Sequence, residues 1–134
     1  MRPLFLLLST LSAFLAVAFG AFGAHGLKAI LSPEMLVVYK TAVTYQMWHA
    51  LGLGLIALLI NTQQSSRLLH YAGWLMFAGI LLFSGSLYAL SLSGLKWLGM
   101  ITPLGGVCFL AAWLLLIIFS FNTYQNKSNK NGTL

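Results

Sequence analysis

The sequence contains very little charge. Only 6% of its 134 residues are charged, 60% are hydrophobic, and Glu34 is the single acidic side chain. A soluble globular domain carries roughly a quarter of its residues as charged groups. The shortage excludes an ordinary water-soluble domain. It also leaves few groups for acid and base chemistry, so we do not expect an enzyme.

Cysteine and metal-binding motifs are also scarce. Cys108 is the one cysteine, which excludes an intramolecular disulfide. Its apolar surroundings in the sequence are typical of a small buried hydrophobic residue. His25, Glu34 and His49 have no recognised metal-ligand spacing. We therefore predict no catalytic, cofactor-binding or metal-binding residues.

The chain instead contains four long apolar blocks, at about residues 4–24, 42–60, 68–92 and 101–121. A transmembrane helix needs about 20 such residues. Lipid offers no partner for backbone amides, so each block must close its own hydrogen bonds as a helix. The polar connections are short, and they make sequential neighbours antiparallel. The sequence predicts an all-α integral membrane bundle of four transmembrane helices within residues 1–122.

The ends of the blocks carry helix signals. Ser32-Pro33-Glu34 places a capping serine, a first-turn proline and an acid at the start of a helix. Residues 33–41 are therefore predicted to be an interfacial helix start that leads into the second span. Residues 123–134 are rich in Asn, Gln, Ser and Lys, a composition that predicts a disordered polar tail.

The positive charges predict the orientation. One side of the membrane would carry Arg2, Arg67, Lys127 and Lys130, and the other Lys28, Lys40 and Lys96. This small excess favours both termini in the cytoplasm. The net charge of +6 is interpreted as attraction to anionic membrane lipid and not to nucleic acid, because no basic cluster is dense enough to follow a phosphate backbone.

The first block allows a second interpretation as a cleavable signal peptide. Arg2, the apolar run and the small residues near 21–24 fit that pattern. The apolar run is long for a signal sequence, and no soluble domain follows it. A retained transmembrane span is therefore favoured.

Polar side chains within or beside the apolar blocks are the candidate functional residues. This polar cluster contains His25, Thr41, Tyr45, Gln46, His49, Ser84, Ser86 and Thr102. Tyr45 and Gln46 lie one helical turn before His49 and can contact its ring. An ionisable side chain in a span usually faces the bundle interior. Two interpretations stay open: hydrogen bonds that fix helix packing, or a site for a proton or polar ligand.

Small residues spaced four apart predict where helices approach closely. The predicted helix-packing residues are Ala16, Gly20, Ala24, Gly85 and Ala89.

Four segments together resemble a known family. They are G-A-F-G-A-H-G-L (20–27), Y-K-T-A-V-T-Y-Q-M-W-H-A-L (39–51), F-S-G-S-L-Y (83–88) and I-T-P-L-G-G (101–106). Their order and spacing resemble the domain-of-unknown-function 423 family, the small YgdD/YwdK-type membrane proteins of bacteria. The resemblance implies a multi-pass protein of the bacterial inner membrane without an established activity, and it supplies no catalytic residues.

Two functions are compatible with these features. The first is a structural or interaction protein, whose small-residue faces dock a larger membrane protein or a second copy. The second is a unit that binds or transports a polar solute, a lipid headgroup or a proton at the cluster around His49. Four helices enclose too little space for a wide pore, so transport would need an oligomer.

Overall fold

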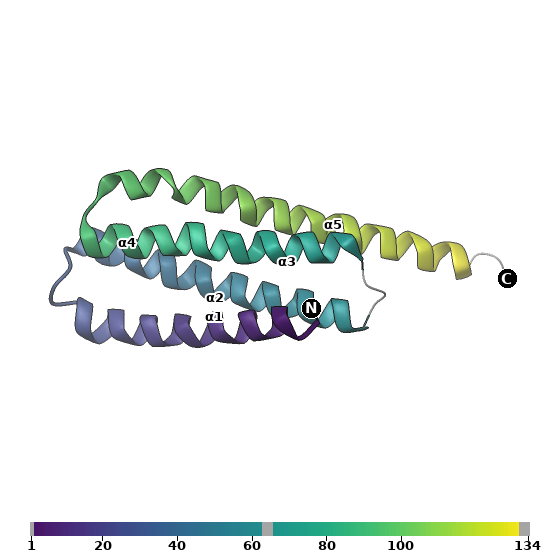
Figure 1. The fold of residues 1–134 in the computed structure, drawn as a ribbon, viewed down its shortest axis with the longest axis horizontal. Coiled ribbons are helices and arrows are strands. Elements are labelled where there is room, and N and C mark those ends of the chain that lie inside the picture. Colours follow the sequence, from purple (N-terminus) through teal and green to yellow (C-terminus); the bar gives the residue numbers. More distant parts are fainter. Residues whose placement is uncertain (1, 63–65, 132–134) are drawn as a thin grey trace.

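The computed structural model describes residues 2–62 and 66–131, in which four long helices lie side by side (Figure 1). The first helix is α1 (Arg2–Phe22), continued by a π-helical turn η1 (Gly23–Leu27), and the second is α2 (Pro33–Thr62). The third helix consists of α3 (Arg67–Gly79), a π-helical turn η2 (Ile80–Ser84) and α4 (Gly85–Ser93). A short 3-10 helix, η3 (Lys96–Met100), precedes the fourth helix, α5 (Thr102–Asn131). Each is long and apolar enough to cross a bilayer. The predicted all-α membrane bundle is confirmed.

Local signals explain where these helices begin and end. The amide of Met35 donates a hydrogen bond to Ser32 Oγ at 3.3 Å, so the serine caps the first turn of α2. The third helix ends at Gly94, which has a φ of 73° and donates its N–H to the carbonyl of Leu90 at 2.8 Å. Glycine adopts this left-handed conformation without a steric cost, which stops the helix cleanly.

The C-terminal segment differs from the sequence prediction. A disordered tail was expected from residue 123, but α5 continues to Asn131 and projects beyond the other helices (Figure 1). Thr123 Oγ1 donates to the carbonyl of Phe119 at 2.9 Å, one turn back. The transmembrane part has already nucleated this helix, so each further residue extends it at little cost. Residues 132–134 of the predicted tail lie outside the described residues.

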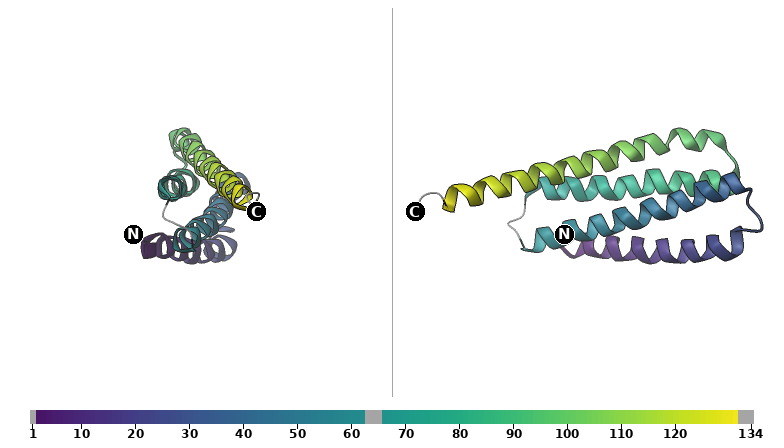
Figure 2. Two further views of the ribbon diagram at one scale, coloured as in Figure 1. Left: turned by 90° about the vertical axis from the view of Figure 1, so that its right-hand side faces the viewer. Right: turned by 180° about the vertical axis from the view of Figure 1, so that it is seen from behind.

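The helices pack in the order in which they follow one another. α1 packs mainly on α2, α2 on the third helix, and the third helix on α5. Figure 2 shows this order from behind and end-on. The largest fully buried side chains are Phe5, Leu53, Ile56, Ile60, Leu69, Met76 and Ser84. The core therefore lies along the shared faces of consecutive helices, which leaves the seams between non-consecutive helices less tightly closed.

The third helix lies very close to α5 at the π-helical turn η2. A Cβ placed on Gly105 would collide with the backbone nitrogen of Phe83, in η2. Small residues allow such backbone approach, and helix association in lipid depends on this packing. The I-T-P-L-G-G segment thus provides a close backbone contact through Gly105.

Candidate functional site

Gln46 connects three helices. Its Nε2 donates to the carbonyl of Ser12 in α1 at 2.9 Å, and its Oε1 accepts from the Tyr88 hydroxyl in α4 at 2.8 Å. The side chain is buried, at 5% exposure. Both ends of the amide therefore have a partner of the correct type, with the nitrogen donating and the oxygen accepting.

Three further hydroxyl groups join neighbouring helices. Ser9 Oγ donates to the carbonyl of Ala50, Ser84 Oγ to that of Ala42, and Tyr39 OH to that of Phe19, each at 2.8 Å. Within the described part of the chain, every side-chain nitrogen or oxygen atom that is itself fully buried has a hydrogen-bond partner. Lipid cannot replace such partners, so these bonds hold the polar groups inside the bundle.

Ser86 and Thr102 join the third helix to the start of α5. Their hydroxyl oxygens lie 2.7 Å apart, and Ser86 Oγ also lies 3.0 Å from the carbonyl of Phe83. A carbonyl can only accept, so Ser86 donates to Phe83 and Thr102 donates to Ser86. Thr102 is thus the first residue of α5 and also its hydrogen-bonded link to the third helix.

His49 has a different environment. Its Nδ1 lies 2.7 Å from the carbonyl of Tyr45 on its own helix, so Nδ1 carries the proton. The imidazole stacks on Phe109 of α5, with ring centres 3.4 Å apart and planes inclined by 13°. The edge of Trp113 faces the same ring at 6.2 Å. His49 is only 6% exposed, yet its Nε2 has no hydrogen-bond partner among the described residues.

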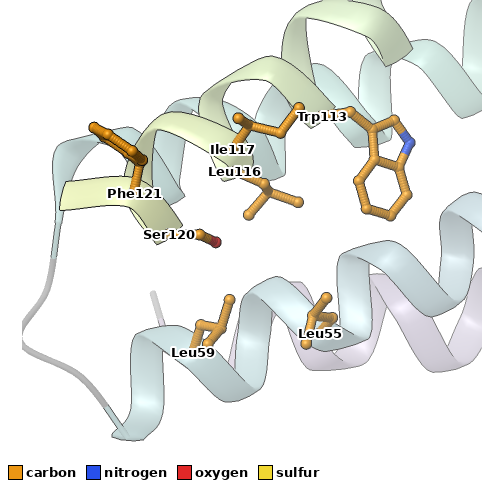
Figure 3. Close-up of a pocket in the computed structure, with 7 residues that line it drawn as sticks. All are labelled: Leu55, Leu59, Trp113, Leu116, Ile117, Ser120 and Phe121. Atoms are coloured by element: carbon orange, nitrogen blue, oxygen red, sulfur yellow. The ribbon is translucent and has the colours of Figure 1, made fainter. Parts of the chain in front are cut away.

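Two grooves follow the seam between α2 and α5. The first, of about 390 Å³, lies beside His49 and is lined by Tyr45, Phe83, Phe109 and Trp113 together with residues of the first turns of α5; we call it the His49 groove. The second, of about 460 Å³, lies further toward the chain termini between Leu55 and Leu59 of α2 and Leu116, Ile117, Ser120 and Phe121 of α5 (Figure 3); we call it the terminal groove. Trp113 lines both and separates them.

A third groove lies on the other side of α2. It has a volume of about 290 Å³ and is bounded by α1 and the third helix, with Gln46 and Tyr88 in its wall. Its remaining lining is almost entirely aliphatic and aromatic. We call it the Gln46 groove.

The structure divides the predicted polar cluster. Gln46 and Ser84 face the helices on one side of α2, whereas Tyr45 and His49 line the His49 groove on the other. The ring of Tyr45 stacks beside His49 at 5.8 Å, as the helical spacing predicts, but Gln46 turns to α1 and α4. Tyr45 and Gln46 are adjacent on α2, and about 100° of helical rotation separates adjacent positions, so the two side chains serve different interfaces.

The remaining cluster residues lie apart. His25 is exposed in η1, and Thr41 Oγ1 donates to the carbonyl of Val37 one turn back on α2. Ser86 and Thr102 form their own pair near the start of α5. The eight predicted residues therefore do not surround one common site. Among the described residues, no three His, Cys, Asp or Glu side chains come together.

The predicted packing residues also fall into two groups. Ala16 is buried, and a Cβ on Gly20 would lie 3.3 Å from Val43, so this part of α1 closely approaches α2. Gly85 and Ala89 instead face outward, and a Cβ on Gly85 would meet nothing within 4 Å. Ala24 is exposed in η1.

Several residues with structural roles were not among the predicted site residues: Ser9, Ser12, Tyr39, Tyr88, Phe109 and Trp113. Ser9 offered a signal, since its hydroxyl interrupts an apolar block, whereas Ser12 contributes its backbone carbonyl, which any residue could supply. Phe109 and Trp113 gave none, because an aromatic residue in a span is equally suited to lipid and to a groove wall.

The fold and its buried hydrogen bonds define a small multi-pass α-helical membrane protein. The model of a family described as "Protein of unknown function (DUF423)" matches residues 19–106, so the chain belongs to this family. It is 51% identical to UPF0382 membrane protein SAB0533 of Staphylococcus aureus, over 88% of this chain and 95% of the relative. It is 49% identical to UPF0382 membrane protein YwdK of Bacillus subtilis, over 85% and 93%. No solved structure gives a significant match.

These comparisons establish the kind of protein. The relatives are bacterial membrane proteins whose names state no substrate or reaction. The chain is accordingly a membrane protein of an uncharacterised family.

Proposed function

We propose that the chain is a structural or interaction protein of the membrane and not a transporter or an enzyme. The observation that carries this proposal is the pairing of its buried polar groups. Gln46, Ser84 and Ser9 all bond to neighbouring helices of the same chain, and the grooves at the surface are lined mainly by apolar side chains. A path for a polar solute would need polar groups available to replace its water.

The interacting surface in this proposal is the terminal groove. Leu55, Ile117 and Phe121 line it and are 46%, 64% and 59% exposed, and the lining residues come from the two facing helices α2 and α5 (Figure 3). Side chains of another transmembrane helix can insert between such ridges, and van der Waals packing is a main force in helix association in lipid. The proposed occupant is a transmembrane helix of a larger membrane protein or of a second copy.

Site-specific photocrosslinking in native membranes tests this surface. A photoreactive residue at Ile117 should give one discrete protein adduct, identified by mass spectrometry. The matched control is Leu7 of α1, which is similarly exposed at 61% and lines none of the three grooves. Crosslinks to lipid alone, with no protein partner at either position, would contradict the proposal. An adduct of two identical chains would identify the partner as a second copy.

The transport alternative makes a separate prediction. A unit that conducts protons through His49 should lose its flux in the His49→Ala variant. We expect purified protein in vesicles to give no flux above that of empty vesicles, with wild type and variant alike. A flux that the wild type supports and the variant lacks would establish the alternative.

We also propose that the chain lies in a bacterial inner membrane with both termini in the cytoplasm. The lysine and arginine distribution supports this orientation. Single cysteines introduced at Lys28 and Tyr124 of a Cys108→Ala chain would test it. An impermeant thiol reagent applied to spheroplasts should label position 28 and spare position 124; the reverse pattern would overturn the orientation.

A further inference from the structure

The His49 groove contains a hydrogen-bond acceptor that has no partner among the residues that the structure describes. The Nδ1 proton is committed to the Tyr45 carbonyl, so Nε2 of the neutral ring has a free lone pair. His49 is only 6% exposed, so more than nine-tenths of the residue is buried. Every fully buried polar side-chain atom in the described part is paired. The unpaired Nε2 therefore remains accessible from outside the protein.

The walls of this groove are aromatic. Tyr45 stacks on Phe83 with ring centres 4.5 Å apart, and Phe109 covers one face of His49 at 3.4 Å. Trp113 closes the groove on the side of the terminal groove and is 38% exposed. Flat aromatic walls favour a flat ligand, because offset stacking adds to the burial of apolar area. The volume of about 390 Å³ lies within the usual range for small-ligand sites.

The depth of the acceptor restricts the ligand further. Phe109 lies seven residues after Thr102, the first residue of α5, which corresponds to about 10 Å along the helix axis. Next to that helix start, η3 carries Lys96 and an exposed Trp97, side chains typical of the membrane interface. His49 therefore lies below the level of phospholipid headgroups. Acyl chains reach this depth but offer no hydrogen-bond donor.

We propose that the His49 groove binds a flat, lipid-soluble molecule that carries a ring hydroxyl, of the phenol or quinol class. The hydroxyl donates to Nε2 of His49, and the ring lies against the aromatic walls. The site is separate from the terminal groove of the proposed function, because Trp113 lies between them. No redox or covalent step is part of the proposal.

Two probes built on the same naphthalene ring isolate the hydrogen bond. 2-Naphthol has a ring hydroxyl, whereas 2-methoxynaphthalene has the same ring and no donor. Binding to the full chain in phosphatidylcholine vesicles is measured by titration and corrected for partition into protein-free vesicles. We expect 2-naphthol to bind about tenfold more tightly, the effect of one hydrogen bond. Equal affinity for the two probes would overturn the proposal.

Two histidine variants form the matched control. His49→Phe retains an aromatic ring and removes the acceptor, so it should abolish the tenfold preference. His70 also bonds through Nδ1 to a carbonyl of its own helix, Ser66 at 3.1 Å, but it does not line the groove. His70→Phe should therefore leave the preference unchanged. Loss of the preference in both variants would exclude a specific site at His49.

A third variant keeps the proposal testable if His49→Phe does not fold. Val107 lines the groove and is 63% exposed, so Val107→Trp fills the groove without entering the core. It should weaken the binding of both probes while His49 remains in place. In 15N-histidine NMR, 2-naphthol should shift the Nε2 signal of His49 in the wild type. An Nε2 signal that no probe moves would indicate that water or an acyl chain occupies the groove, and would overturn the proposal.

Discussion

The two sides of α2 show two ways of using a polar side chain in a membrane. On one side, Gln46 has a partner at each end of its amide and joins α1 to α4. On the other, His49 lies three residues further along; within the described part of the chain its ring bonds only to its own helix, and it stacks on Phe109. On the Gln46 side, both ends of the amide are hydrogen-bonded within the chain. On the His49 side, an acceptor is available to another molecule.

This difference shows that residue burial alone does not distinguish a polar side chain that is fully paired from one that keeps an unpaired atom. Gln46 and His49 are almost equally buried, at 5% and 6% exposure. What separates them is whether each polar atom has a partner on a neighbouring helix. Substitutions on the two sides should therefore differ in whether they change stability or binding.

The largest effect is expected at Gly105, whose replacement would separate α5 from the third helix and so break the His49 side. Gly105→Ala places a methyl group against the backbone of Phe83, which cannot move like a side-chain tip. We expect a loss of about 3 kcal/mol in the free energy of unfolding, measured by SDS titration in mixed micelles. The control is Gly85→Ala, where the added Cβ meets nothing within 4 Å. Equal destabilisation by the two variants would show that the close contact is not what matters.

A direct test of the comparison pairs Gln46→Leu with His49→Phe. Gln46→Leu leaves the Tyr88 hydroxyl without its acceptor, and should cost about 1–2 kcal/mol of unfolding free energy. His49→Phe removes one bond within a single helix and retains the stacking ring, so its cost should stay below about 0.5 kcal/mol. The same SDS titration measures both. A larger loss for the histidine variant would reverse the assignment of the two sides.

A smaller effect is expected for the link between Ser86 and Thr102. Their hydroxyls lie 2.7 Å apart, and hydrogen bonds between membrane helices contribute about 0.6 kcal/mol on average. A double-mutant cycle with Ser86→Ala and Thr102→Val isolates this interaction. We expect the coupling to lie near that average. Additive losses would mean that the two hydroxyls contribute independently, and that the seam at the start of α5 is held by packing alone.

Much of the fold could be predicted from the sequence. Apolar length and lipid's lack of hydrogen-bonding partners restrict the four blocks to helices. Ser32-Pro33-Glu34 correctly placed the start of α2. The π-helical turns η1 and η2 gave no such signal in the sequence. The helix over residues 123–131 was also missed. The composition of this segment predicts that it is solvated, but it does not reflect the effect of the preceding transmembrane helix, which the segment extends.

The candidate site was less predictable. Helical spacing correctly put Tyr45 beside His49, since that contact is local. It could not decide which neighbouring helix each polar group would meet, so Gln46 and His49 were expected to share one cluster. Phe109, which stacks on His49, lies 60 positions later in the chain, and only the tertiary packing brings the two rings together. Helix-local contacts are thus predictable from spacing, whereas partners on other helices require the packing.

The smallest expected effect concerns a hydroxyl whose hydrogen bond stays within its own helix. Thr41 Oγ1 donates to the carbonyl of Val37 within α2, so Thr41→Val removes no contact between helices and preserves the branched shape. The unfolding free energy should change by less than about 0.5 kcal/mol in the SDS titration. Ser84→Ala is the matched comparison, because Ser84 is 1% exposed and its hydroxyl donates across to α2. If Thr41→Val proved as damaging as Ser84→Ala, bonds within a helix would contribute as much as bonds between helices, and the paired Gln46 and self-bonded His49 could no longer be distinguished on that ground.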